Sequence, residues 1–244
     1  VQPIVTATVR TQLAGTLFKL FFRDGQMVRE GQVLAQIDPR PYQLALAQAK
    51  ANLARDEAQL AAAQVDLNRY ETLLKQDSIA SQQVDTQRAT VRQLTGTIAA
   101  DKAAIGTAQL NLTYTSVKAP VTGRAGIRQV DIGNYLTPSD SNGIVVVTQL
   151  DPIDVGFALP QAQLSDIGHA AGSGAGLPVQ ALDQNNNKVL VTGRFLTFDN
   201  QVDTTTGTVK AKARFDNKGN ALFPSQFVNV SMLVNTLHNA VTVP

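Results

Sequence analysis

The chain has 244 residues, of which 43% are hydrophobic and 16% charged, and it contains neither cysteine nor tryptophan. Lys and Arg number 21 against 19 Asp and Glu, so the formal net charge is +2, and without a basic block nothing in the composition favours nucleic-acid binding. The lack of cysteine excludes disulfides, thiolate metal sites and a cysteine nucleophile. Apolar runs are far shorter than the ~20 residues that a membrane-spanning helix needs. Because the chain begins at Val1 without a signal region, we expect a mature or trimmed protein of one to three domains.

The distribution of helix-breaking residues divides the chain. No proline occurs between Pro41 and Pro120, and only Gly96 and Gly106 interrupt a stretch rich in Ala, Gln, Leu and balanced charge. Outside it, Gly, Pro, Thr, Val and Phe dominate. Because Ala, Leu, Gln, Glu, Lys and Arg favour helices whereas β-branched and aromatic residues favour strands, the composition predicts a helical insert between β-rich flanks.

Two heptad series run through this insert and predict the seam between two helices. The series consist of Leu46, Leu53, Leu60, Leu67 and Leu74, and then of Val84, Val91, Ile98, Ile105 and Leu112. The step from Leu74 to Val84 is ten residues, and the polar residues 76–78 lie at the break, so the second series does not continue the first. Two long helices joined by a short polar break predict an antiparallel coiled-coil hairpin.

The faces outside the seam decide whether this hairpin projects or is buried. Each arm has ~35 residues and hence a length of ~50 Å, which exceeds the width of a compact domain of this size. Small residues share the seam (Ala49, Ala63 and Ala108), and charges occupy the remaining faces: Lys50, Arg55, Asp56, Glu57, Asp66, Arg69, Arg88, Arg92, Asp101 and Lys102. Two core helices of an ordinary bundle are the alternative. A narrow seam with solvated sides favours a projecting hairpin.

The flanks of the insert resemble each other. Gly15 and Gly25 are ten residues apart and precede the sequence Gln-Ile-Asp-Pro at 36–39, while Gly123 and Gly133 have the same spacing and precede Gln-Leu-Asp-Pro at 149–152. We expect these glycines to lie in turns that need a positive φ. The second copy holds about five extra residues, which we place at 137–143. Chance spacing of common turn residues is the alternative. Two strand-turn-strand units, each too small for a core of its own, can bury one by packing face to face.

These motifs, in this order, resemble a known family. The segment AGTLFKLFFRDGQMVREGQVLAQIDPRPYQ before the hairpin and the segment YTSVKAPVTGRAGIRQVDIGNYL after it are similar to the periplasmic adaptors, or membrane fusion proteins, of tripartite resistance-nodulation-division (RND) efflux pumps. The C-terminal segment FDNQVDTTTGTVKAKARFDNKGNALFPSQFVNVSMLV resembles one branch of that family in particular. The resemblance extends over nearly the whole chain.

The resemblance implies an elongated α+β fold. It consists of a lipoyl-like β-sandwich (9–40 and 114–151) interrupted by a long antiparallel α-helical coiled-coil hairpin (41–113) and followed by a small antiparallel β-barrel (1–8 and 152–244). The residues agree with this independently, because β-rich runs at 189–195, 209–215 and 227–234 are separated by turn signals. A short helix is expected at 161–167. Family members continue into a membrane-proximal domain, which we expect to be mostly absent from this chain.

Motifs for catalysis or cofactors are weak. The segment from Gly172 to Gly176 lacks the Lys and Ser/Thr of a phosphate-binding loop, so a surface loop is the better interpretation. The two histidines, His169 and His238, are 69 residues apart and have no metal-ligand spacing. Carrier domains with a lipoyl-like fold present a modifiable lysine on the turn that the hairpin replaces here, and no lysine lies there. We therefore expect no catalysis, no cofactor and no metal.

The resemblance also implies function and partners. It predicts a periplasmic adaptor, associated with the inner membrane, that links an inner-membrane RND transporter to a TolC-type outer-membrane channel in drug efflux. It further implies a homo-oligomer, a trimer or hexamer, around the pump axis, and no nucleic acid. The alternatives are an adaptor of an ABC-type exporter or type I secretion system and, less favoured, a lipoyl or biotinyl carrier.

At the tip of the hairpin the family places an Arg, a Leu four residues later and a Ser seven after that, and these contact the channel. Arg69 and Leu73 match this pattern, whereas Ala80 occupies the serine position and Ser81 follows it. One residue of displacement rotates a helical side chain by ~100°. From the heptad pattern alone, without the family resemblance, Arg69 is interpreted as a solvated charge beside the seam. Leu73 is interpreted as a neighbour of the seam residue Leu74.

Overall fold

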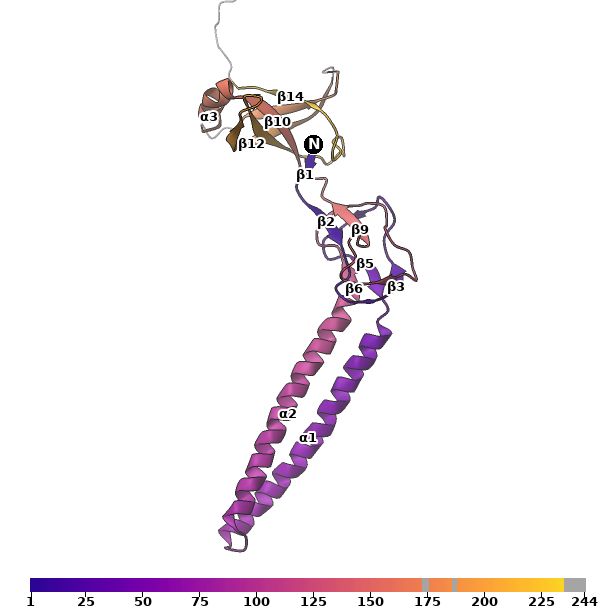
Figure 1. Ribbon diagram of the computed structural model, residues 1–244, viewed down its shortest axis with the longest axis vertical. Helices are drawn as coiled ribbons and strands as arrows, with labels where there is room; N and C mark the ends of the chain where they lie inside the picture. Colours follow the sequence, from indigo (N-terminus) through magenta and orange to yellow (C-terminus); the bar gives the residue numbers. More distant parts are fainter. Residues whose placement is uncertain (173–175, 186–187, 235–244) are drawn as a thin grey trace, which may run out of the picture.

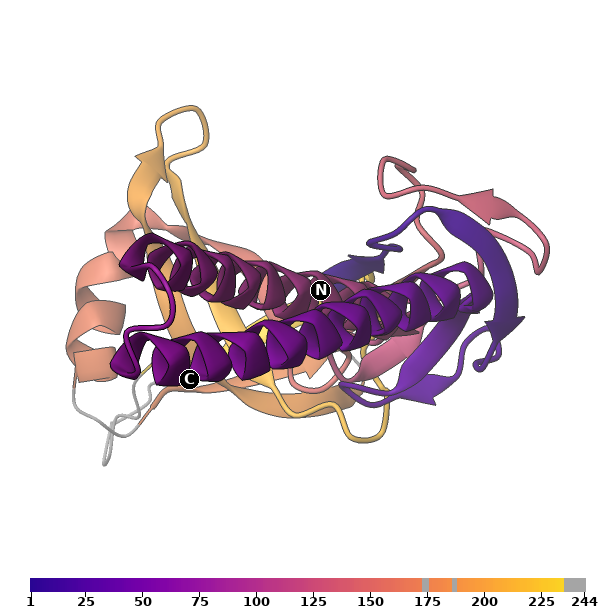
Figure 2. The same ribbon diagram turned by 90° about the horizontal axis from the view of Figure 1, so that it is seen from below.

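The computed structural model describes residues 1–172, 176–185 and 188–234. The molecule is elongated, with a β-sheet domain at one end, a second group of strands in the middle and a helical hairpin that projects from it (Figure 1). Seen along the long axis, the two hairpin helices lie side by side (Figure 2). Among the described helices, none combines the length and apolarity that crossing a membrane requires.

The elements alternate between short strands and a few helices. In chain order they are β1 (Gln2–Pro3), β2 (Thr6–Val9), β3 (Gly15–Leu20), β4 (Met27–Val28), β5 (Val33–Ile37), α1 (Arg40–Lys75), α2 (Ser81–Tyr114), β6 (Ser116–Lys118), β7 (Gly123–Ala125), β8 (Tyr135–Leu136), β9 (Val145–Thr148), β10 (Ile153–Pro160), the 3₁₀ turn η1 (Gln161–Gln163), α3 (Leu164–Gly172), β11 (Pro178–Leu182), β12 (Val189–Asp203), β13 (Thr208–Phe215) and β14 (Asn229–Met232). The helix expected at 161–167 is therefore present and extends further along the chain.

The middle of the molecule is a sandwich of two four-stranded sheets, ordered β2-β9-β7-β4 and β6-β5-β3-β8. Exchanging the segment β2 to β5 with the segment β6 to β9 converts each strand order into the other. The sequence repeat thus has a structural counterpart, an internal two-fold relation in which β3 pairs with β8 and β4 with β7. Each copy contributes to both sheets, so neither can bury its apolar face without the other.

One core fills the space between these sheets. Its fully buried members come from both copies: Leu17, Leu34 and Ile37 from the first, and Ile144, Val145 and Val147 from the second, among others. The extra residues of the second copy lie between β8 and β9, where the expected insertion at 137–143 is found. The first copy begins earlier than expected, because β2 (Thr6–Val9) pairs with β9 of the sandwich instead of joining the six-stranded sheet.

The four matched glycines serve two purposes, only one of which was expected. Gly25 and Gly133 have φ of 75° and 97° and do lie in turns that precede β4 and β8. Gly15 and Gly123 instead begin β3 and β7, so the expectation of turns was wrong for them. A side chain on Gly15 would lie 2.6 Å from Cγ2 of Ile37, and one on Gly123 would collide with a backbone carbonyl. Close strand packing explains this second pair.

The hairpin is inserted between two neighbouring strands. Helix α1 follows β5 after two residues, α2 ends next to β6, and β5 and β6 pair antiparallel. A polar cluster reinforces this junction: the Gln36 amide donates to Thr115 Oγ1 at 2.9 Å, and the Ser116 hydroxyl donates to Gln36 Oε1 at 3.1 Å. The two helices therefore continue a β-ladder, which fixes the direction in which the hairpin projects.

Along the hairpin, all ten residues of the two heptad series are buried or half-buried. The most enclosed are Leu46, Leu67, Val84 and Ile98. Apart from Tyr70 and Leu94, the intervening core positions, three residues after each member, hold small or polar side chains. Among them are Asp56 and Asp101, which the sequence placed on the solvated faces. That placement was wrong for both, because Asp56 is only 4% exposed and Asp101 is half-buried.

The remaining strands form a six-stranded antiparallel sheet, ordered β1-β10-β13-β12-β11-β14. Its core includes Ile153, Val155, Val179 and Phe215, and α3 covers one end through the buried Ile167. The two outer strands approach each other: the Ser225 amide, shortly before β14, donates to the Val1 carbonyl just before β1.

A buried amide connects this sheet to the sandwich. Asn217, in the turn after β13, is 1% exposed; its Nδ2 donates to the Leu150 and Leu222 carbonyls, and its Oδ1 accepts from the Leu222 amide. Its backbone amide donates to Asp151. Because Leu150 and Asp151 form the link between β9 and β10, this single side chain fixes the chain where the two β domains meet.

Candidate functional site

The tip of the hairpin is the candidate functional site, and its turn is built from backbone hydrogen bonds. Helix α1 ends at Lys75, the amides of Gln76 and Ser78 donate to the Leu73 carbonyl, and Asp77 has a left-handed φ of 54°. These bonds satisfy the last carbonyls of the helix as an αL cap does. The chain reverses within five residues, so the helices remain antiparallel up to the tip.

Arg69 and Leu73 lie one helical turn apart on the same face of α1. The Arg69 side chain is 64% exposed and forms an ion pair with Asp66 at 3.2 Å on its own helix. Leu73 is half-buried beside the seam residue Leu74. This agrees with the interpretation made from the heptad pattern alone. An exposed i,i+3 ion pair contributes little to stability, so the guanidinium is free to exchange Asp66 for another acceptor.

Ala80 and Ser81 begin the second helix across the turn. Ala80 is the N-cap residue of α2, with φ −74° and ψ 139°, and no side chain caps the helix there. Ser81 occupies the first helical position and is exposed. The structure thus brings all four tip residues into the last turns of the hairpin, and the serine hydroxyl lies one residue beyond the cap position that would use it.

Replacing Ala80 with serine is expected to stabilise the tip. Its backbone already has the N-cap conformation, so the new hydroxyl can accept a hydrogen bond from the Gln82 amide, which contributes about 1 kcal/mol. Amide hydrogen exchange in the first turn of α2 would measure this as slower exchange. Thr90→Ser, in the interior of the same helix, is the control and should leave those amides unchanged; equal exchange in Ala80→Ser and the parent would contradict the prediction.

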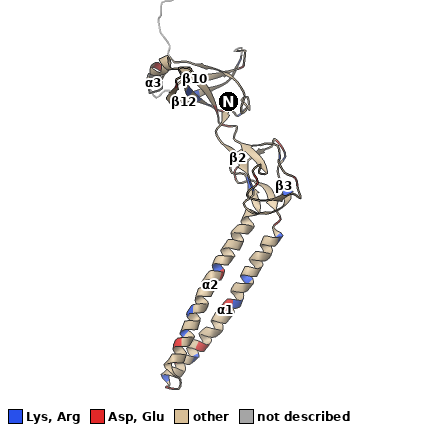
Figure 3. Cartoon of the chain, in the orientation of Figure 1, with Lys and Arg blue, Asp and Glu red and all other residues tan. Residues whose placement is uncertain are grey.

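Cross-helix contacts near the tip were missed by the sequence analysis. The Gln87 amide donates to the Ala63 carbonyl at 2.8 Å across the seam, and Arg88 forms an ion pair with Glu71 at 2.8 Å. Gln87 lies three residues after Val84, at the second core position of its heptad. This spacing could have predicted from the sequence that Gln87 lies in the seam. The small Ala63 leaves its carbonyl accessible to the glutamine. Charged residues are distributed along both helices of the hairpin, from its base to its tip (Figure 3).

At the other end of the hairpin, Asp38 and Arg40 form a local ion pair. The Arg40 side chain donates to both oxygens of Asp38 and its backbone amide donates to Oδ1. These hydrogen bonds hold the pKa of Asp38 below its usual value. The pair lies at the start of α1, where the helix dipole stabilises a negatively charged carboxylate. It occupies the turn in which a carrier domain would present its lysine.

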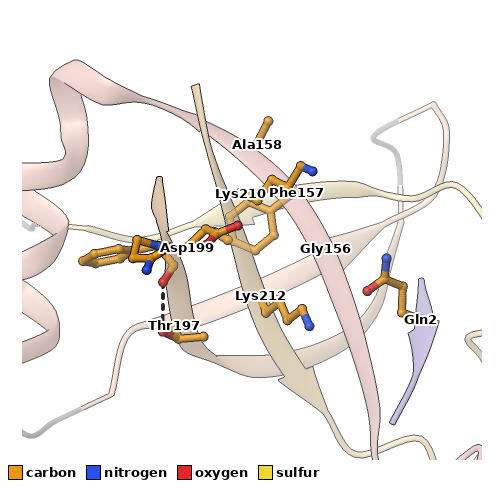
Figure 4. Close-up of a pocket in the computed structure, with 11 residues that line it drawn as sticks. Gln2, Gly156, Phe157, Ala158, Thr197, Asp199, Lys210 and Lys212 are labelled. Atoms are coloured by element: carbon orange, nitrogen blue, oxygen red, sulfur yellow. Dashed lines mark hydrogen bonds between the residues drawn. The ribbon is translucent and has the colours of Figure 1, made fainter. Parts of the chain in front are cut away.

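An open groove of about 750 Å³ lies on the six-stranded sheet (Figure 4). Gln2, Gly156 and Phe157 line it together with Lys210, Lys212 and Asp199. Asp199 is the one carboxylate among the lining residues. The groove therefore lacks the paired carboxylates that a sugar-cleaving enzyme needs.

Metal sites were not expected, and within the described ranges no three His, Asp or Glu side chains are grouped so that they could hold a metal ion. His169 lies in α3. Residues 173–175 of the glycine-rich segment and His238 are outside the part of the chain that the structure describes.

Two family models match the chain and together cover most of it. The model described as the RND MFP barrel-sandwich hybrid domain matches residues 5–148, and that described as the RND MFP beta-barrel domain matches residues 152–236. Together with the two-sheet sandwich and the projecting hairpin, these matches define the class: the chain belongs to the RND membrane fusion proteins.

Curated relatives place it within that class. Over 239 residues, 98% of the chain, it is 51% identical to the multidrug resistance protein MdtA of Pantoea ananatis and 52% identical to that of Pectobacterium carotovorum. The chain is therefore an MdtA-like membrane fusion protein, as the C-terminal resemblance indicated. It spans 58% of the length of these two relatives.

Solved structures share the fold. MacA from Actinobacillus actinomycetemcomitans is 22% identical with a TM-score of 0.71, over 95% of this chain and 75% of that one. A MacA–MexA chimera that contains the Pseudomonas aeruginosa MexA α-hairpin domain is 23% identical with a TM-score of 0.64, over 96% and 79% of the two chains.

Proposed function

We propose that the protein is a periplasmic adaptor of a multidrug efflux pump, which connects an inner-membrane RND transporter to a TolC-type outer-membrane channel without catalysing a reaction. The observation that carries this proposal is the projecting hairpin, whose 36-residue first helix gives a reach of about 54 Å. Membership of the RND membrane fusion proteins and about 50% identity to MdtA relatives support it.

In this proposal the tip of the hairpin contacts the channel. Arg69 and Leu73 offer one exposed cation and one half-buried apolar side chain on a common face, and Ser81 offers a hydroxyl at the start of α2. The hairpin helices pack against helices of the channel through a coiled-coil seam of the kind that the ten heptad residues form. The ion pair of Arg69 with Asp66 is exchanged for a partner carboxylate or carbonyl.

The six-stranded sheet is assigned to the transporter side. We propose that it closes into a small β-barrel, because the hydrogen bond between Ser225 and Val1 links the segments that lead into its two outer strands, β1 and β14. We further propose that this barrel lies toward the inner membrane. The groove with Lys210 and Lys212 belongs to this domain. We place the protein in the periplasm, at the inner membrane.

Neighbouring copies of the adaptor are proposed to pack side by side around the pump axis as a trimer or hexamer. The face of α1 opposite the seam is apolar and exposed, with Leu44 72% and Val65 57% accessible. Exposed alanines continue the stripe between them: Ala47, Ala51, Ala54, Ala58 and Ala61. Such a surface, without charged residues, is suited to contact with another helix.

An adaptor for an ABC-type exporter or a type I secretion system would share the hairpin and the sandwich. Both matching family models are described for RND proteins, which favours the RND transporter.

The decisive experiment is purification of the tagged, full-length protein from native membranes under mild cross-linking, followed by mass spectrometry of the bound transporter. We expect an RND transporter together with an outer-membrane channel. Recovery of an ABC exporter would overturn the assignment, and recovery of lipoyl or biotin on a lysine would indicate a carrier.

A further inference from the structure

Two carboxyl groups meet across the middle of the hairpin. Asp56 lies three residues after Leu53 on α1 and Asp101 three residues after Ile98 on α2, so both occupy core positions of their heptads. Asp56 is 4% exposed. Oδ2 of Asp101 is fully enclosed and has no hydrogen-bond partner among the described residues when both groups are treated as carboxylates. Two facing carboxylates with no donor between them are costly in a packed seam.

The charged groups around the pair make the two acids unequal. Arg55 donates to both oxygens of Asp56, at 2.6 and 3.0 Å, and these bonds lower the pKa of Asp56. Burial, followed by the hydrogen bond to Asp56 and its negative charge, raises the pKa of Asp101, and only the more distant charge of Arg55 opposes this. On α2 itself the neighbouring charge is Lys102, which is exposed to solvent.

We propose that Asp101 carries a proton that it donates to the Asp56 carboxylate, and that this shared proton holds the middle of the hairpin closed as a pH-sensitive clamp. With the proton present, the Asp101 hydroxyl satisfies the facing acceptor and Arg55 neutralises the remaining charge. When the proton is lost to solvent, two carboxylates face each other in a poorly hydrated seam, and their repulsion loosens the helices locally. The clamp needs only the hairpin and is independent of the proposed adaptor function.

The pH dependence has two limits of opposite sign. Asp101 has its folded pKa above the unfolded value of 3.8, so its contribution to stability is complete below 3.8 and is lost as the pH rises through the folded pKa. Asp56 has its folded pKa below 3.8, so its contribution is present above 3.8 and is lost as the pH falls through the folded pKa. The hairpin is therefore held tightest between the lowered pKa of Asp56 and the raised pKa of Asp101.

Hydrogen exchange in the intact chain tests the clamp. Amides at 53–59 and 98–104 are compared over a series from pH 4 to pH 7.5 after correction for intrinsic rates. We expect protection to fall as the pH rises from 4 through the folded pKa of Asp101. It should fall about tenfold for each pH unit in which only the folded state holds the proton. Asp101→Asn supplies a neutral donor in the same place and should remove this pH response. Asp85→Asn is the matched control, because Asp85 lies on the same helix and is 73% exposed; it should respond as the parent does.

Equal protection of the parent throughout this pH series would overturn the proposal, and so would an unchanged pH response in Asp101→Asn. A direct titration covers the case in which the variant does not fold. Carboxyl ¹³C shifts of the unmodified chain should show Asp101 titrating above 3.8 and Asp56 below it. Two acids that both titrate at the ordinary value would exclude a shared proton.

Discussion

Cells that produce the full-length protein with Arg69→Asp and Leu73→Ser together are expected to lose drug resistance, down to the level of cells without the protein. The first change replaces the exposed cation at the tip by an anion, and the second removes the apolar side chain on the same helical face. The two side chains are one turn apart, so both losses fall on one contact surface. Minimum inhibitory concentrations and cross-linking to the channel measure the effect.

The matched control is Arg92→Asp with Leu110→Ser. It makes the same chemical changes on exposed positions of the same hairpin, farther from the tip, and should retain resistance and cross-linking. Circular dichroism of both double variants checks that the helices remain folded. Retained resistance and cross-linking in Arg69→Asp with Leu73→Ser would show that the tip does not make the contact.

Phe215→Ala is expected to destabilise the six-stranded sheet by about 3–5 kcal/mol, the usual cost of deleting a buried phenylalanine. Phe215 is fully buried, and its ring covers Gly193 on the neighbouring strand, where a side chain would strike it. The truncation therefore leaves a cavity above a residue that cannot fill it. Since each 1.4 kcal/mol is a factor of ten, amides of β10 and β13 should exchange roughly 10² to 10⁴ times faster.

Two further variants separate packing from a general loss of aromatic character. Phe215→Leu keeps most of the volume and should cost clearly less than the alanine change. Phe227→Ala removes a ring that is 83% exposed and should have almost no effect. If all three variants exchanged alike, the ring of Phe215 would not be what holds this sheet together.

Periodicity made the hairpin predictable from the sequence, since two series of five aliphatic residues each specify a seam on a helix. The repeat was visible because the same glycine spacing occurs twice. The role of each glycine was not, because the collision that excludes a side chain at Gly123 involves Thr148 on another strand. Local spacing carries no information about such a neighbour.

The acid pair of the hairpin shows a second limit. Asp56 and Asp101 are charged residues within a strongly helical stretch, and on composition they belong to the solvated faces. Their positions, three residues after a seam leucine and a seam isoleucine, place them in the core all the same. A core position outweighs the polarity of the side chain where a partner such as Arg55 can satisfy it. The tip differs again, because neither periodicity nor burial distinguishes Arg69, and its proposed contact role rests on the family resemblance.

The junction at Gln36, Thr115 and Ser116 makes the hairpin a lever with its fulcrum at the sandwich. Because the arm is about 54 Å long, a rotation of about 5° at the fulcrum moves the free end by roughly 5 Å, close to one helical turn. A change too small to disturb the hydrogen bonds of β5 and β6 is thus large enough to shift one element past another at the far end. Under the proposed function, the position of the hairpin tip depends on three side chains at its base.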